Sequence, residues 1–162
     1  MRKLVYFEVR IRSIGPGDDS GLGMGFVAMP YPTWRLPGWE RASIGVHSDD
    51  GRKYVNDKWG GKDFTDAFVA GETYGIGLEF SISEVPPSYE SQALSLKTEV
   101  FFTKNGKKIG GWNLNEELDA QQDLGIEGLE GQNDLFAAIG VFGAMEFDIL
   151  FNRSDWMWTE SA

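Results

Sequence analysis

The side chains best suited to gripping another molecule gather in a short stretch that begins at Tyr31, Trp34 and Arg35. Aromatic rings bury a large area at a small cost in side-chain entropy, and arginine adds bidentate or stacking contacts. The prolines among them prevent a helix, because each proline ring removes a backbone donor and clashes with the preceding turn. This pattern predicts a recognition loop, with Arg41, Tyr54 and Trp59 as further binding candidates. The alternative is that these aromatic rings fill the end of the core.

Groups for catalysis are scarce in this sequence. His47 is the one histidine, and it lies in an apolar strand pattern. Its neighbour Ser48 points to the opposite face of that strand, so the two side chains do not form a nucleophile–base pair locally. Without cysteine and with one histidine, the chain has too few ligands for a transition metal. We therefore expect a structural histidine, no enzymatic activity, no metal and no cofactor.

Acidic residues dominate the charge, which is −10 at neutral pH. This sign opposes binding to a nucleic-acid backbone and favours solubility or a basic partner. Glu116, Glu117, Asp119 and Asp123 lie close together, but their order does not follow the EF-hand pattern. A solvated acidic loop is the favoured interpretation. A glycosidase-like carboxylate pair stays open, because the separation of two carboxyl groups is not readable from sequence.

Alternation of apolar and polar residues predicts about nine short strands separated by turns, and no convincing helix. Asn105-Gly106 is a strong hairpin signal, and the many glycines fit a fold with tight turns and close crossings. Such a pattern predicts an all-β sandwich. The expected strands cover residues 5–12, 23–28, 42–47, 52–55, 74–80, 96–103, 107–112, 135–142 and 145–152.

One domain over residues 1–162 is the economical interpretation, with residues 83–95 and 113–134 as loop insertions. No apolar run approaches the roughly 20 residues of a membrane span, so we expect a soluble domain without membrane contact of its own. Any anchor of the natural protein would lie outside this chain.

The first insertion contains a short linear motif, Pro86-Pro87-Ser88-Tyr89. Two prolines preset the polyproline II conformation, and a tyrosine two residues later fits the groove of a WW domain. Pro86, Pro87 and Tyr89 are therefore candidate WW-domain ligands. Loops are rich in proline in any case, which is the structural alternative.

Several segments resemble the SPRY family, in the form found in Ran-binding-protein-M, and they follow its order along nearly the whole chain. This resemblance implies a bent antiparallel β-sandwich with binding loops at one end, and it implies a structural role for Trp39. It also implies that Phe142, and with it Arg41 and Ala42, lies at or beside the peptide-binding face. The matching segments are Leu36-Pro37-Gly38-Trp39, Ser43 to Gly51, Gly71 to Gly77, Phe101 to Gly110 and Leu135 to Gly140.

Residues 31–39 and 49–57 are most similar to fungal endosomal and vacuolar membrane adaptors, which recruit HECT-type ubiquitin ligases to membrane-protein cargo. The resemblance implies a non-catalytic domain that binds a peptide or a cytosolic cargo tail, on the cytosolic side of these membranes. WW domains of the ligase are the second expected partner. The alternatives are a scaffold or substrate-receptor domain of a multisubunit ubiquitin ligase, and a carbohydrate-binding β-sandwich.

Overall fold

Antiparallel strands make up nearly all the regular structure of the chain. The computed structural model describes residues 2–56, 60–82, 96–114, 128–129 and 133–160. A short 3-10 helix, η1, at Arg153–Asp155 follows the last strand. The strands are β1 (Arg2–Ile14), β2 (Gly21–Ala28), β3 (Ser43–His47), β4 (Lys53–Val55), β5 (Thr73–Ile82), β6 (Leu96–Lys104), β7 (Lys107–Asn113), β8 (Leu135–Phe142) and β9 (Met145–Leu150).

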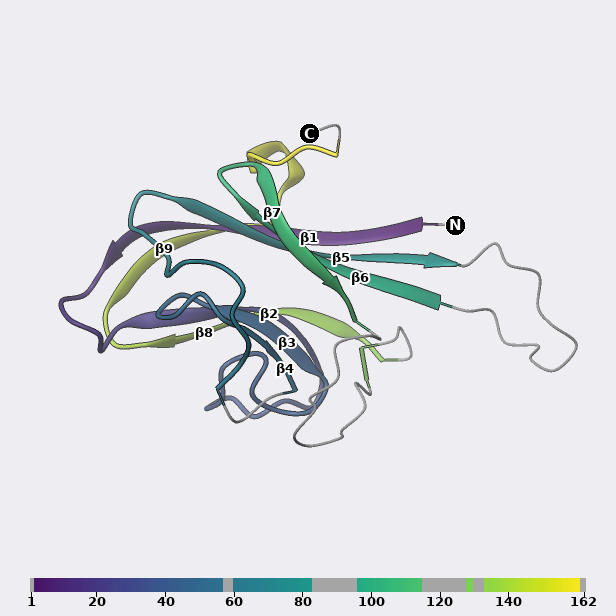
Figure 1. Cartoon of the computed structure of the whole chain (residues 1–162), viewed down its shortest axis with the longest axis horizontal. Coiled ribbons are helices and arrows are strands. Elements are labelled where there is room, and N and C mark those ends of the chain that lie inside the picture. The colour runs from purple at the N-terminus through teal and green to yellow at the C-terminus, as the bar shows by residue number, and fades with distance from the viewer. Residues whose placement is uncertain (1, 57–59, 83–95, 115–127, 130–132, 161–162) are drawn as a thin grey trace, which may run out of the picture.

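The strands form two stacked sheets (Figure 1). One sheet has five strands in the order β7-β6-β5-β1-β9, and the other has four in the order β4-β3-β2-β8. Every described strand pair is antiparallel, and the hairpin of β8 and β9 joins one sheet to the other. The expected antiparallel β-sandwich is confirmed. Within the residues that the structure describes, no helix has the length and hydropathy needed to cross a bilayer.

The core lies between the sheets and is built from the alternate residues that the sequence pattern predicts. Phe7, Val9 and Ile11 of β1 face Leu22, Met24 and Phe26 of β2, and all six side chains are buried. The burial of apolar area at these positions is the main force that holds the two layers together.

Turn signals in the sequence match the backbone. Asn105 and Gly106 have φ angles of 50° and 82°, the left-handed conformations that a type I′ hairpin requires. β1 extends from Arg2 to Ile14, which is longer than the alternation alone predicts. The predicted insertion at 83–95 lies outside the described residues, as does most of 113–134, whose first residue is the last of β7.

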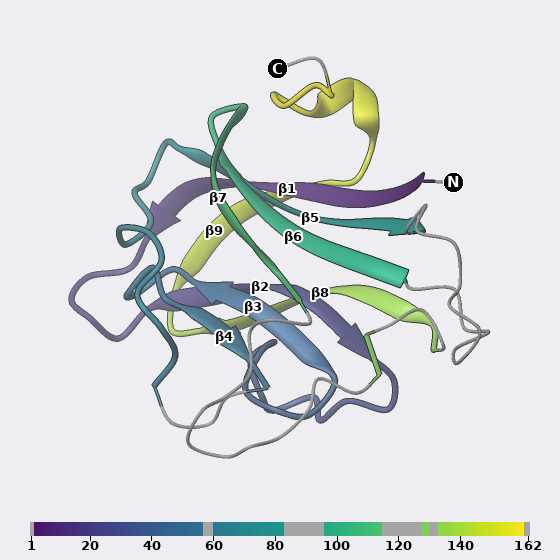
Figure 2. The ribbon, with the colours of Figure 1, turned by 45° about the vertical axis from the view of Figure 1, so that its right-hand side comes forward.

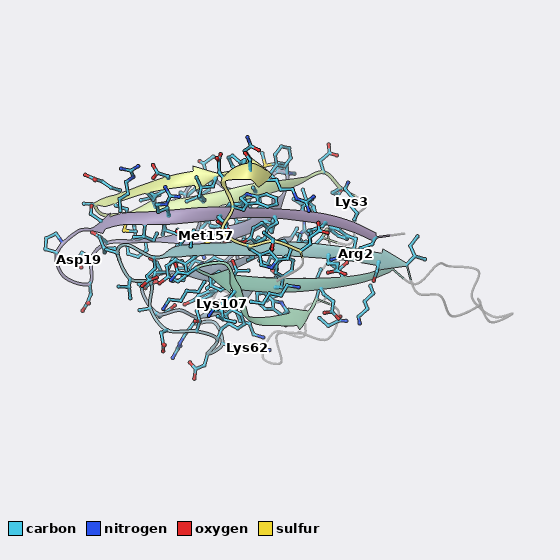
Figure 3. The ribbon with its side chains drawn as sticks, turned by 90° about the horizontal axis from the view of Figure 1, so that it is seen from above. Arg2, Lys3, Asp19, Lys62, Lys107 and Met157 are labelled. Carbon is cyan, nitrogen blue, oxygen red and sulfur yellow. The ribbon has the colours of Figure 1, made fainter. Side chains whose placement is uncertain are left out.

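The outer face of the five-stranded sheet is covered by the C-terminal segment, which returns over β1 (Figures 1 and 3). Trp158 is 3% exposed and packs on Tyr6 and Phe101, with ring centroids 4.7 and 4.9 Å apart. Glu8 lies beneath this cluster and is fully buried. Its carboxylate accepts hydrogen bonds from the backbone N–H groups of Met157 and Trp158, at 2.8 and 3.0 Å, and from the Tyr6 hydroxyl at 2.7 Å.

Removal of the Glu8 carboxylate tests this attachment. We expect Glu8→Ala to lower the free energy of unfolding by about 2–4 kcal/mol, because the buried Trp158 N–H, the partly buried Met157 N–H and the Tyr6 hydroxyl lose their carboxylate acceptor. Tryptophan fluorescence should shift to the red as Trp158 becomes solvated. Chemical denaturation measures the first effect, with Glu146→Ala on the exposed side of β9 as the matched control. Equal stabilities of the two variants would show that Glu8 does not attach the C-terminal segment to β1.

Candidate peptide-binding surface

Residues 29–42, between β2 and β3, fold back over the outer face of the four-stranded sheet (Figure 2). Leu36 and Pro37 are buried against this face. A Cβ atom placed on Gly140 would come within 2.5 Å of the Leu36 side chain, and one on Gly45 within 2.2 Å of the Pro37 carbonyl oxygen. Glycine at these two positions therefore gives the loop the space in which it docks. We call this docked segment the β2–β3 loop.

Two tight turns shape the β2–β3 loop. The first, at residues 32–35, is closed by a hydrogen bond of 3.3 Å from the Arg35 N–H to the Pro32 carbonyl. The second, at residues 36–39, has Gly38 at φ 102°, with the Trp39 N–H donating to the Leu36 carbonyl at 3.2 Å. Proline followed by a glycine with positive φ is the signature of a type II turn. The Leu-Pro-Gly-Trp motif is thus a turn that lies on the sheet.

An aromatic cluster holds this turn in place. The His47 imidazole Nε2 lies 2.9 Å from the Pro37 carbonyl oxygen, and the ring stacks on Tyr54 with centroids 3.9 Å apart. Trp39 meets the His47 and Tyr54 rings edge-on, which gives it the structural role that the resemblance implies. Tyr54 is 5% exposed and its hydroxyl donates to Asp50, so the expectation that its ring faces a ligand is corrected. The ring belongs to the support of the loop.

Tyr31 also forms hydrogen bonds within the loop. Its half-buried hydroxyl donates to the Leu36 carbonyl at 2.5 Å and accepts from the Glu40 N–H at 3.3 Å. Ser43 Oγ lies 3.3 Å from the same hydroxyl and accepts a hydrogen bond from the Gly38 N–H. Burial raises the pKa of Tyr31, so the hydroxyl stays protonated and can donate. These bonds fix the conformation between the two turns.

The Trp34 and Arg35 side chains differ in how far they are exposed to solvent. The Trp34 side chain is 82% exposed, the most exposed of the large apolar side chains that the structure describes. Arg35 is partly buried: its Nε lies 2.9 Å from a Glu40 carboxylate oxygen, and its guanidinium lies 4.9 Å from the Trp39 ring centroid. The loop thus presents an uncovered indole beside a guanidinium that is already oriented.

Phe142 lies on the same outer face as the docked Leu36. Gly21 pairs with Phe142, and two residues further along, Gly23 pairs with Gly140, over which Leu36 sits. Residues two apart on a strand share a face, so the Phe142 ring and the loop are neighbours on this surface. Phe136, from the same row of β8, is 49% exposed and was not among the predicted binding residues.

Arg41 and Ala42 occupy the far end of the loop. Arg41 is exposed, while the Ala42 carbonyl accepts a hydrogen bond of 2.9 Å from the Ala28 N–H. This contact places them beside the end of β2, whereas Phe142 lies beside its beginning. Trp59 and the motif residues Pro86, Pro87 and Tyr89 lie outside the described residues.

The single histidine makes the anchoring of the loop measurable by pH titration. Burial lowers the pKa of His47 below its usual 6.5, so the folded state favours the neutral imidazole. The unfolded chain therefore takes up the proton first as pH falls through about 6.5, and the folded protein loses stability. Each tenfold difference in proton affinity is worth about 1.4 kcal/mol.

We expect an NMR midpoint for the His47 ring below 6.5 and a fall in melting temperature between about pH 7 and about pH 5.5. His47→Gln, which has no titrating group, should show a shallower fall over this range. A midpoint at or above the usual value, with equal slopes for both proteins, would show that the imidazole is not held neutral.

Comparison with known proteins places this chain in a family. Residues 4–121 match the SPRY domain. The chain is 29% identical to the protein ssh4 of Sclerotinia sclerotiorum over 98% of its own length and 24% of that protein. It is 32% identical to the Ran-binding proteins 9/10 homolog of Drosophila melanogaster, over 66% of the chain and 9% of that protein. The chain thus spans a quarter or less of these relatives.

A solved structure agrees with the sequence comparison. The crystal structure of a human SPRY domain superposes with a TM-score of 0.60 at 28% identity, and the match covers 91% of this chain and 76% of that one. Both the predicted motifs and the observed sandwich are therefore explained by one relationship. The chain belongs to the SPRY family of non-catalytic domains that bind protein partners.

Proposed function

We propose that this domain binds an extended peptide, such as the cytosolic tail of a membrane protein, across the β2–β3 loop and Phe142. The supporting observation is Trp34, an indole 82% exposed on a loop with two hydrogen-bonded turns, of which the second is docked on the sheet through Leu36 and Pro37. A large exposed apolar side chain on a rigid support can bury its area without paying for ordering the loop. The mechanism is therefore largely preformed recognition, with little backbone movement.

Arg35 and Arg41 would determine which polar groups of a ligand are bound. The Arg35 guanidinium is partly buried and held by Glu40, so it offers its remaining N–H groups in a fixed direction. Such groups select carbonyl or carboxylate oxygens of a bound segment. Arg41 is exposed at the other end of the loop, where it would contact a ligand long enough to span the surface.

The proposed cellular role is that of a cargo-binding domain in a ubiquitin-ligase adaptor of endosomal and vacuolar sorting. Similarity to ssh4 over nearly the whole chain supports this role, together with the resemblance at residues 31–39 and 49–57. Similarity to the Ran-binding proteins 9/10 homolog supports a second candidate, a substrate receptor or scaffold of a multisubunit ubiquitin ligase. Both roles use the same surface to hold a polypeptide.

Truncation of Trp34 tests the proposed surface. We expect Trp34→Ala to reduce the recovery of partners by proximity labelling in cells about tenfold or more, since a central tryptophan contributes about 2 kcal/mol or more to binding. Its circular dichroism and melting temperature should not change, because the side chain is exposed. Ile109→Ala, which truncates a 45% exposed apolar side chain on β7 of the other sheet, is the control. Equal labelling by both variants would remove Trp34 from the site.

The motif at Pro86 to Tyr89 gives a separate prediction about ligase recruitment. If this segment binds a WW domain, Tyr89→Ala should weaken binding of the ligase WW domain about tenfold or more, because the tyrosine fills one half of the groove. Isothermal titration of a purified WW domain against both proteins measures the change. Identical affinities would dismiss the motif while leaving the cargo surface untouched.

A further inference from the structure

Strand β8 differs from the other strands that end a sheet in the described part of the chain. Edge strands expose unpaired backbone groups and are normally guarded by charge, by proline or by short length. β4 has three residues, β7 begins with two lysines, and β9 carries Glu146 and Asp148. β8 is eight residues long, Leu-Phe-Ala-Ala-Ile-Gly-Val-Phe, without a charged residue or a proline.

The free backbone groups of β8 can be assigned from the pairing of its neighbour. Ala28 and Leu22 of β2 bond toward β3, since the Ala28 N–H donates to the Ala42 carbonyl and the Leu22 carbonyl accepts from Ser48. Alternate residues of β2, such as Gly23 and Gly25, therefore bond toward β8. The β8 partners of those glycines are Gly140 and Ala138, so the N–H and C=O groups of the residues that alternate with them point away from β2. These residues are Leu135, Ala137, Ile139 and Val141.

The side chains of the same four residues face the space between the sheets. Val141 pairs with the buried Leu22, yet it is 47% exposed. On β9, which lies along the same side of the molecule (Figure 3), Ile149 pairs with the buried Val9 and is 42% exposed. Phe151 follows, packed on Phe7 with 61% of its surface exposed. Inward-facing apolar groups are thus open to solvent along this side.

The opposite side of the sandwich is closed by the chain itself. Phe68 is buried and stacks on Tyr74, while Phe64 packs edge-on against Trp112. The segment that carries both phenylalanines also pairs with β4 through Lys62 and Lys53. A segment that makes one isolated β-bridge and carries apolar side chains thus completes one side of the core, and no described segment does so beside β8.

Charge identifies the kind of polypeptide that fits there. The paired stretch of β8 is uncharged, so a charged residue opposite it would be buried without a partner. Asp134 precedes β8, Glu146 is exposed on β9, and the whole chain carries −10. A second copy of this chain would bring the same acids to the contact, whereas lysine or arginine at the ends of a partner segment would be attracted.

We propose that β8 is a second docking edge, at which an extended, uncharged stretch of a partner polypeptide with basic flanks adds as a further strand. Its backbone would bond to Ala137 and Ile139, and its alternate apolar side chains would cover Val141 and Ile149 between the sheets. This site uses the edge of β8, whereas the β2–β3 loop docks on the outer face of the same strand at Gly140, and it does not require the loop to bind a ligand.

Random peptides displayed on phage, selected against the whole chain, test the proposal. Selected sequences should alternate uncharged apolar residues with small or polar ones between basic ends. Ala137→Pro removes an N–H that points away from β2, so no bond to β2 is broken. It should weaken the binding of a synthetic copy of a selected peptide about tenfold or more. Ala137→Lys guards the edge with charge and should act in the same direction. Ala137→Ser keeps the N–H and is the matched control, with circular dichroism verifying the fold of each variant.

Methylation of alternate backbone nitrogens of the selected peptide should abolish its binding, since these groups would form the ladder. The proposal is overturned if no peptide is enriched, or if selected peptides bind Ala137→Pro as tightly as the unchanged chain. If Trp34→Ala weakens binding of the selected peptides and the Ala137 variants do not, the peptides bind the β2–β3 loop and the proposal for the β8 edge is overturned. A concentration-dependent dimer in sedimentation that Ala137→Pro abolishes would make a second copy the occupant instead.

Discussion

The docking of Leu36 and Pro37 on the glycine-lined outer face of the four-stranded sheet is the contact on which the proposed binding surface depends. Because Gly45 and Gly140 lack a Cβ atom, the Pro37 carbonyl and the Leu36 side chain occupy the space that a Cβ atom would fill. The His47 ring contacts the Pro37 carbonyl and stacks on Tyr54, which supports the docked turn. Docking at these points lowers the number of conformations open to the loop that carries Trp34.

Each sheet therefore has apolar material on both faces. The five-stranded sheet carries the Tyr6, Phe101 and Trp158 cluster on its outer side, and the four-stranded sheet carries the β2–β3 loop. These outer clusters explain why so many aromatic residues are needed for a sandwich of this size. They also leave few aromatic rings for recognition, because most of them support the fold.

Much of the architecture could be predicted from sequence because strand periodicity and turn chemistry are local properties. Asn105-Gly106 predicts its hairpin without reference to the rest of the chain. The roles of the aromatic residues could not be separated in this way. Whether Trp34 or Tyr54 faces solvent depends on how the loop folds back, and that is decided by glycines distant in sequence, such as Gly140.

β8 shows the same limit of sequence patterns. A continuous apolar run is typical of a strand buried on both faces. Its place at the end of a sheet is a property of the strand order, which periodicity does not contain. Phe136 and Val141 are exposed for that reason, although the run consists of residue types that are common in protein cores.

The hydrogen bonds between Glu8 and the backbone of Met157 and Trp158 have a geometric consequence for the polypeptide as a whole. They hold the C-terminal residues against β1, so both ends of the described chain belong to the five-stranded layer (Figure 1). Trp34 projects from the other layer. Residues 2 and 160 thus belong to the layer opposite the one that carries Trp34.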